Sequence, residues 1–276
     1  MLVHRETPQE NFCYTNQMII LLSSSKTMRT PSVTQEKLTK PLLQEQAYKL
    51  ATQLKILSET DIKKIMKVSN SLARRTRQLI DSWTDESEGT MPAADSFLGD
   101  IYSGLRYREL SNEAKSRANE RLRILSGLYG ILRPRDGIYP YRLEMGYRIS
   151  TKTHRNLYDY WGKTIAQTLP KDSIMINLAP DEYSKAVLPH LPKNTVVISP
   201  KFLTYNKEAN KPTFVAVHAK IARGSFARWL LEENVLQPQQ LSRFNLLGYA
   251  YEPDLSKNNQ PVFVCQNFQG FGLSIK

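Results

Sequence analysis

The chain has 276 residues, of which 41% are hydrophobic and 23% charged, a balance that excludes wholesale disorder and suits one large or two small domains. No apolar run approaches the roughly 20 residues of a membrane helix. Two cysteines without CxxC spacing and four scattered histidines exclude a disulfide framework and a recognisable zinc site, so a reducing, cytoplasmic setting is expected.

The net charge is +12, and the charges are clustered along the chain. Residues 55–80 carry seven basic and two acidic side chains, residues 81–100 six acidic and no basic ones, and residues 101–165 thirteen basic and six acidic ones. Clustered basic residues favour polyanionic partners, because each neutralised phosphate releases condensed counterions. A solvated basic surface without an acidic partner explains the same pattern equally well.

In chain order, residues 1–17 are expected to form a disordered tail, with Met18 as a possible true start. Residues 18–25 predict a short buried strand that ends in a polar loop. Apolar residues at helical spacing then predict helices over 44–57 and 59–67. Thr60, directly before an acidic residue, is the expected N-cap of the second helix.

Further helices are predicted over 71–83, after Pro92, and over 111–122 and 155–169. Alternating apolar and polar residues predict a strand over 213–222, and a helix is expected to start just after Gly224. Apolar runs predict three more strands, over 173–179, 194–199 and 261–268. The pattern predicts a mixed α/β (α+β) fold, a single compact domain over residues 18–276 with a central sheet and surrounding helices.

No P-loop, GxGxxG, GxSxG or HExxH motif occurs, which argues against nucleotide-dependent, hydrolase and zinc-protease functions. Two polar clusters follow predicted strands. Lys26 is suited to pair with phosphate, or to act as an amine nucleophile if desolvation lowers its pKa. Asp181 and Glu182 are suited to acid–base or metal chemistry, although acids after Pro180 also stabilise a helix N-terminus.

A third cluster is basic. On the predicted strand, His218, Lys220 and Ala222 share one face, so the basic pair projects together. Arg223 then precedes the predicted helix start at Gly224, which is a natural position for binding an anion. A solvated strand face is the alternative.

Residues 125–146, LSGLYGILRPRDGIYPYRLEMG, combine glycines, prolines, tyrosines and arginines in one stretch. The turns hold Arg133, Arg135 and Arg142 on constrained backbone. Arginine suits phosphate oxygens and tyrosine stacks on bases, so a binding role is favoured. The alternative is that Glu144 pairs with one of these arginines and that the tyrosines belong partly to the core.

The fifth cluster, residues 59–83, predicts two short helices joined by a tight hairpin. This is the helix-hairpin-helix arrangement of non-specific duplex binders, in which amides and a helix N-terminus hold the backbone. The usual Gly-x-Gly hairpin is replaced by residues 68–71, VSNS. An ordinary helical hairpin with a basic outer face is the alternative.

Together these segments resemble the YaaA family of peroxide stress resistance proteins. The matching segments run in order from about Met18 to Phe268: IILLSSSKT, GDIYSGL, LSGLYGILRPRDGIYPYRLEMG, YDYWG, INLAPDEYSKAV and HAKIARG. Two loops depart from the family pattern. Ser24 and Ser25 stand where the family has Pro and Ala, and Pro180 stands where it has Ser.

The resemblance implies a helix-hairpin-helix element, a positively charged cleft, DNA binding and a cytoplasmic role in surviving hydrogen peroxide. That role is associated with limiting free intracellular iron, and so Fenton damage to DNA. The expected partner is duplex or branched DNA, bound largely without sequence preference and without a metal, a membrane or a small-molecule cofactor. The predicted DNA contacts are Val68, Ser69, Asn70, Ser71, Arg74, Arg75, Arg77, Arg133, Arg135, Arg142, Lys220 and Arg223, supported by Tyr141, Glu144 and Tyr183.

Two alternatives concern chemistry rather than binding. A glycosylase- or lyase-type enzyme would act on a flipped base through Lys26 or Lys220 with Asp181 or Glu182. Direct iron ligation by carboxylates is the other, but no histidine or cysteine spacing supports such a site.

Overall fold

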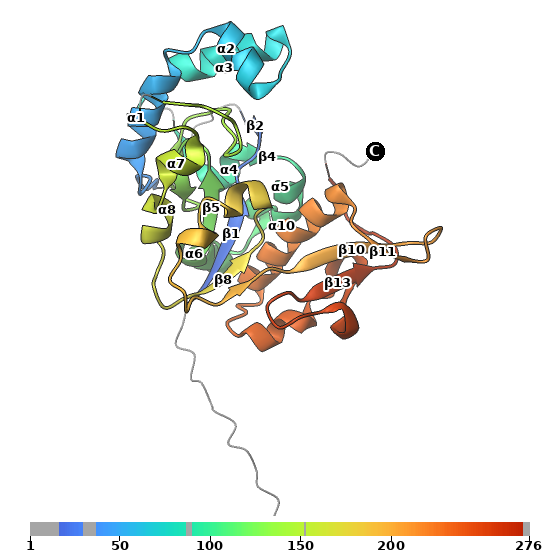
Figure 1. The fold of residues 1–276 in the computed structure, drawn as a ribbon. Coiled ribbons are helices and arrows are strands. Elements are labelled where there is room, and N and C mark those ends of the chain that lie inside the picture. Colours follow the sequence, from blue (N-terminus) through green and yellow to red (C-terminus); the bar gives the residue numbers. More distant parts are fainter. Residues whose placement is uncertain (1–16, 30–36, 87–89, 152, 273–276) are drawn as a thin grey trace, which may run out of the picture.

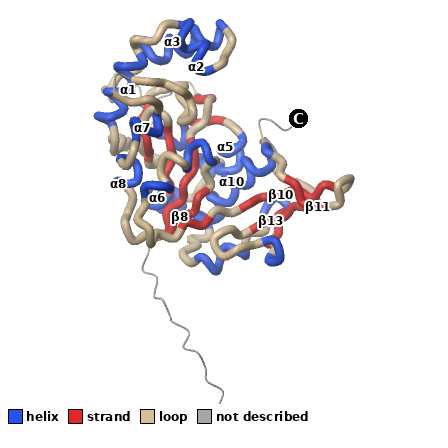
Figure 2. The backbone as a smooth tube through the Cα atoms, viewed as in Figure 1, coloured by secondary structure: helices blue, strands red, loops and turns tan. Residues whose placement is uncertain are grey.

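The computed structural model describes residues 17–29, 37–86, 90–151 and 153–272 (Figure 1). Of the predicted tail over residues 1–17, residues 1–16 lie outside the described ranges. The strands form two groups, and the helices lie around them, as Figure 2 shows. Within the described part of the chain, no helix combines the length and apolar character that crossing a membrane requires.

The central sheet has five strands in the order β6-β5-β1-β8-β9. Strand β1 runs parallel to β5 on one side and to β8 on the other, and every β1 residue is buried. An apolar run that is buried on both faces is typical of a parallel sheet covered by helices. The strands are β1 (Met18–Ser23), β5 (Leu122–Ser126), β6 (Gly130–Leu132), β8 (Ile174–Asn177) and β9 (Val197–Ile198).

A second sheet, in the order β11-β10-β13-β12, carries the C-terminal part of the chain. The rings of Phe202 and Phe263 stack at 5.5 Å, and Phe226 and Phe244 meet at 4.9 Å, so an aromatic core holds this sheet against helix α10. The elements are β10 (Lys201–Asn206), β11 (Lys211–Thr213), β12 (Tyr249–Tyr251), β13 (Val262–Cys265) and α10 (Ala216–Glu232).

The remaining elements connect or cover the two sheets (Figure 1). Two small antiparallel pairs, β2 with β4 and β3 with β7, lie in the connections. The helices are α1 (Gln44–Leu54), α2 (Glu59–Met66), α3 (Asn70–Ser82), α4 (Ala93–Ser96), α5 (Asp100–Leu105), α6 (Asn112–Arg121), α7 (Leu157–Trp161), α8 (Thr164–Gln167) and α9 (Asp181–Ser184). The small strands are β2 (Thr27–Met28), β3 (Met91–Pro92), β4 (Phe97–Leu98) and β7 (Gly137–Ile138), and the 3-10 helices are η1 (Tyr107–Glu109), η2 (Leu188–His190), η3 (Pro238–Arg243), η4 (Leu246–Gly248) and η5 (Pro253–Leu255).

Helices α2 and α3 form a helical hairpin beyond α1 at one end of the molecule (Figure 1). The N-cap of α2 is Ser58 and not Thr60, because Ser58 and Asp61 form a reciprocal capping box. Lys67 ends α2 in the left-handed conformation, with φ of 52°, and the Ser69 hydroxyl accepts a hydrogen bond from the Leu72 amide to open α3. The turn is therefore closed by ordinary capping.

The predicted strand over 213–222 is wrong, and so is the predicted helix start at Gly224. Strand β11 ends at Thr213, and α10 runs unbroken from Ala216 through Gly224 to Glu232. Its small residues allow α10 to pack closely on α5, which an exposed strand would not do. The predicted helix over 155–169 is divided into α7 and α8 at Gly162, which has φ of 42°.

Candidate nucleic-acid interface

A pocket of about 320 Å³ lies at the carboxyl end of the central sheet, and we call it the sheet-end pocket. Parallel strands β1 and β8 both end there, so the loops that follow them meet at one edge. Helices α5 and α10 complete its wall. Its polar lining includes Lys26, Glu144, Glu182, Tyr183, Lys220 and Arg223.

Lys26 and Glu144 form an ion pair in this pocket, with 2.8 Å between Nζ and Oε2. The bond to Glu144 raises the pKa of Lys26 above its usual value. Burial raises the pKa of Glu144, and this effect outweighs the attraction of the ammonium group. The alternative that Glu144 pairs with an arginine is therefore wrong, and Lys26 is a fixed cation at neutral pH.

Tyrosine hydroxyls support the loop that carries Lys26. Ser24 donates a hydrogen bond to the Tyr183 hydroxyl at 3.2 Å, and the Tyr102 hydroxyl donates to the Ser23 carbonyl at 2.9 Å. The Tyr141 hydroxyl lies 2.6 Å from that of Ser126, and burial raises the pKa of Tyr141 to about 12. These phenols stay neutral at physiological pH and position the loop.

Glu182 and Asp181 occupy the first turn of α9 but have different environments. Glu182 Oε1 accepts a hydrogen bond from the Gly146 amide at 2.9 Å, which joins α9 to the end of the 125–146 stretch. Asp181 is exposed and does not line the sheet-end pocket. Only the second of these two carboxylates therefore reaches the pocket.

Lys220 and Arg223 lie one turn apart on α10, so both side chains face the pocket. Lys220 is exposed, and Arg223 is half-buried. Burial lowers the pKa of Arg223, while Asp181 favours its charged form. Among the described residues neither cation has an ion-pair partner within 4.0 Å, so both charges are available to a ligand.

A second pocket of about 490 Å³ adjoins the first, and we call it the α3 pocket. It lies between α3 and β2, and Lys26 lines both pockets. Arg142 donates a hydrogen bond to the Lys26 carbonyl at 3.1 Å, whereas Arg75 is exposed and has no ion-pair partner among the described residues. The two pockets together form what we call the basic groove, with cations Lys26, Arg29, Arg75, Arg142, Lys220 and Arg223.

Arg77, Arg133 and Arg135 are predicted DNA contacts that line neither pocket of the basic groove. Arg133 pairs with Asp136 at 2.8 Å, and Arg135 donates to the Lys37 carbonyl at 2.8 Å. Arg77 pairs with Asp81 and also donates to the Leu57 carbonyl. These guanidinium groups stabilise the fold, because each bonds to a nearby carboxylate or carbonyl. An arginine beside a buried carboxylate or a helix end is occupied by that partner.

The rest of the predicted hairpin contact also lies outside the two pockets. Val68, Ser69, Asn70 and Ser71 form the capped turn, and Arg74 lies 3.7 Å from Glu59 across the hairpin. Of the twelve predicted DNA contacts, the structure thus brings Arg75, Arg142, Lys220 and Arg223 together in the basic groove.

Replacing Asp136 with alanine is expected to lower the free energy of unfolding by about 3 to 5 kcal/mol, because it leaves Arg133 unpaired beside a buried site. The Asp136 side chain is fully buried, and it accepts hydrogen bonds from the Arg133 amide at 2.7 Å and from the Thr39 hydroxyl at 2.6 Å. Urea denaturation measures the change. A loss below about 1 kcal/mol would contradict a structural role for this pair.

Arg29 in the basic groove and Arg106 and Arg108 beside it were not predicted from the sequence. Arg29, Arg106 and Arg108 line a third pocket of about 250 Å³, which shares Arg29 with the α3 pocket and Gly99 with the sheet-end pocket. The positive charge of residues 101–165 was the signal for two of them. Nothing in the pattern indicated that η1 folds back toward the loop after β1.

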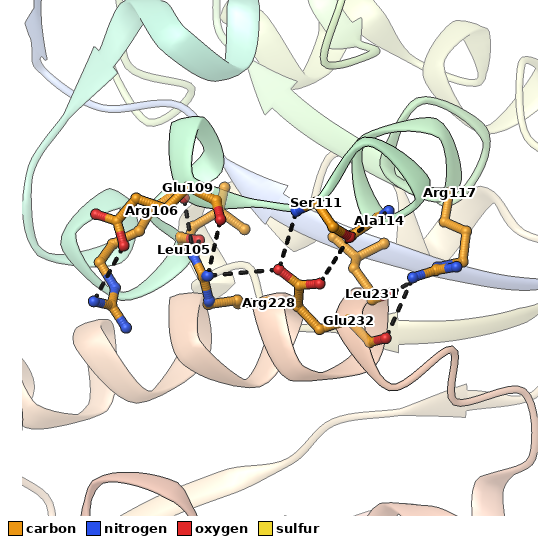
Figure 3. A network of polar contacts seen from close by, with 9 residues as sticks. All are labelled: Leu105, Arg106, Glu109, Ser111, Ala114, Arg117, Arg228, Leu231 and Glu232. Carbon is orange, nitrogen blue, oxygen red and sulfur yellow. Dashed lines mark hydrogen bonds and ion pairs between the residues drawn. The ribbon is translucent and has the colours of Figure 1, made fainter.

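Helix α10 is fixed against α5 and α6 by a polar network (Figure 3). Arg228 donates to the Arg106 carbonyl at 3.0 Å and to the Glu109 carbonyl at 3.2 Å. Glu232 accepts a hydrogen bond from the Ser111 hydroxyl at 3.0 Å, and Arg117 donates to the Leu231 carbonyl at 2.6 Å. These bonds hold the helix that presents the two α10 cations to the sheet-end pocket.

The chain has two cysteines, and the structure describes one of them. Cys265 is a buried free thiol, and burial raises its pKa, which makes it unreactive. Cys13 lies outside the described residues. Within the described ranges, no three His, Cys, Asp or Glu side chains are grouped as a metal site needs.

Comparison with known proteins shows the family of this chain. The family model described as "Peroxide stress protein YaaA" matches residues 18–255. A UPF0246 protein of Salinispora tropica is 51% identical, covering 94% of this chain and 98% of the relative. UPF0246 proteins of Roseobacter denitrificans and Caulobacter vibrioides are 39% and 38% identical, covering 82% and 89% of this chain and 90% and 98% of the relatives. The resemblance found in the sequence motifs is thereby confirmed, and the chain belongs to the YaaA family of peroxide stress proteins.

Proposed function

We propose that the basic groove binds the phosphate backbone of DNA, and that the protein protects DNA during peroxide stress in the cytoplasm. The observation that carries this proposal is the convergence of cations from distant segments. Arg75 comes from α3, Lys26 and Arg142 from two loops, and Lys220 and Arg223 from α10. Phosphate contacts of this kind position a protein on DNA without reading its sequence.

The environment of these cations supports the proposal. Arg75 and Lys220 are exposed and have no ion-pair partner among the described residues, so contact with phosphate breaks no internal bond. The family description supports a role in peroxide stress, and DNA is a target of the Fenton chemistry that peroxide drives. Binding to DNA would place the protein at that target. The proposed role also includes limiting free intracellular iron, the metal on which Fenton chemistry depends.

The test of this function is a salt titration of DNA affinity. About six phosphate contacts predict that the logarithm of the binding constant falls with the logarithm of salt concentration at a slope near −5. The titration uses the full chain and a perfect duplex of unselected sequence, measured by fluorescence anisotropy. A flat dependence on salt, or no binding in low salt, would overturn the proposal.

An enzyme of the lyase type is the second candidate, because the sheet-end pocket holds two lysines together with three carboxylates. The structure argues against Lys26 as its nucleophile. The bond to Glu144 raises the pKa of Lys26, so this bond favours the charged ammonium over the neutral amine that a nucleophile requires.

We therefore expect borohydride treatment of the protein with abasic-site DNA to trap no covalent adduct through Lys26 at pH 7.5. The measurement compares the wild type with Lys26→Ala by denaturing gel electrophoresis. Lys220→Ala serves as the second arm, because Lys220 is the other lysine of the pocket. An adduct that disappears only in Lys26→Ala would contradict this reading and would favour the enzyme.

A further inference from the structure

Besides Asp100, the carboxylates of Glu144 and Glu182 line the sheet-end pocket of the basic groove. Glu144 is 9% exposed and Glu182 is half-buried, and both line the same pocket as Lys26, Lys220 and Arg223. Like charges repel, and the repulsion strengthens where water is excluded. A pocket made only for phosphates would be weakened by these two groups, so it is suited to another part of a nucleic acid.

Glu182 and Glu144 each keep one carboxylate oxygen available. Glu182 uses Oε1 to accept the Gly146 amide, and Glu144 uses Oε2 to pair with Lys26. Within the described residues, no donor contacts the other oxygen of either group. A partly buried acceptor calls for a hydrogen-bond donor. Phosphates supply only acceptors, whereas the amino and ring N–H groups of nucleobases supply donors.

The rest of the pocket fits the remainder of a nucleotide. Arg223 and Lys220 are without ion-pair partners among the described residues and face the same space, where they suit the phosphates on either side of a nucleotide. Tyr102 and Tyr183 also line the pocket. A volume of about 320 Å³ suits one small ligand, and is far too small for a duplex.

We infer that the sheet-end pocket takes a single unpaired nucleotide of the DNA held in the basic groove. Its base donates hydrogen bonds to Glu182 and Glu144, and its flanking phosphates lie against Arg223 and Lys220. This inference rests on the proposed function. It adds a preference for DNA that contains an unpaired or easily displaced nucleotide, because such a nucleotide costs the least to remove from the stack.

The test compares a perfect duplex with a duplex of the same length that carries one bulged 2-aminopurine nucleotide. Wild-type protein is expected to bind the bulged duplex at least about tenfold more tightly, since a hydrogen bond to a charged group is worth that much or more. The fluorescence of 2-aminopurine is expected to rise on binding, because the base leaves the stack.

Glu182→Gln is the decisive variant. Its amide oxygen can still accept the Gly146 amide, while the available oxygen becomes an NH₂ donor that cannot accept from a base. The preference for the bulged duplex over the perfect duplex is expected to fall to about threefold or less. Glu113→Gln, an exposed site on α6 that lines neither pocket, is the matched control and should keep the full preference.

The outcomes separate this inference from the proposed function. Salt-dependent binding of both duplexes with equal affinity, and no change in 2-aminopurine fluorescence, would overturn the inference and leave the function intact. A preference that is unchanged in Glu182→Gln would also overturn it. Binding of a free mononucleotide without any preference among duplexes would overturn it in favour of a small-molecule ligand. Absence of all DNA binding would overturn the function itself.

Discussion

Gly224→Ala is expected to lower the free energy of unfolding by about 3 kcal/mol or more, because α5 and α10 cross backbone to backbone at this position. A Cβ atom at Gly224 would lie 1.8 Å from the Ile101 carbonyl oxygen, and one at Gly104 would lie 2.0 Å from the Ile221 carbonyl oxygen. Neither contact can be relieved by a side-chain rotation. The helices would have to separate, and the network around Arg228 opposes that movement.

Chemical denaturation of the wild type and the variant measures this loss. Lys220→Ala, an exposed position on the same helix, is the control and is expected to change the free energy of unfolding by less than about 0.5 kcal/mol. Gly224→Ala protein that unfolds at the wild-type denaturant concentration would show that α5 and α10 do not pack as described. The sheet-end pocket would then lose its assigned wall.

The double variant Arg75→Ala/Lys220→Ala is expected to bind DNA about a hundredfold more weakly than the wild type in 0.1 M salt. Each phosphate contact contributes roughly a factor of ten at that concentration through counterion release. Both side chains are exposed and unpaired among the described residues, and they line different pockets of the basic groove. The variant is therefore expected to fold normally.

The matched control for this variant removes the same charge at the other end of the molecule. Lys171 and Lys193 are exposed and precede β8 and β9, which both run parallel within the central sheet. They therefore lie at the amino end of the strands, away from the basic groove. Lys171→Ala/Lys193→Ala should bind within about threefold of the wild type. Equal losses in the two double variants would indicate attraction by net charge instead of a groove.

Continuous patterns in the sequence predicted much of the fold. The apolar runs of β1, β8 and β13 are buried strands, and the helical spacing of α1 to α3 gives helices within a few residues of the predicted bounds. Such elements are decided by local burial alone. A central sheet with surrounding helices was predicted from them, but its strands β5 and β6 were not.

Other elements depended on contacts that no local pattern contains. The residues of α10 alternate like a strand over its first turns, but the small side chains pack against α5, and that long-range contact selects the helix. Strand β10 was not predicted, because its exposed and half-buried polar residues pair with β13 from the far end of the chain.

The site was predicted where residues directly follow parallel strands, as Lys26 and Glu182 do. The prediction failed where a nearby carboxylate pairs with a predicted contact arginine. Arg133 forms an ion pair with Asp136, three residues later in the chain. Because that carboxylate is buried, the internal pair is favoured over a contact with DNA. Whether an arginine meets a buried partner or open solvent depends on the fold and not on its own sequence neighbours.

The most direct test of the central claim is the slope of DNA affinity against salt in three proteins. The wild type should give about −5, Arg75→Ala/Lys220→Ala about −3, and Lys171→Ala/Lys193→Ala about −5, because each lost phosphate contact reduces the slope by about one. The same slope in all three proteins would contradict a DNA-binding role for the basic groove.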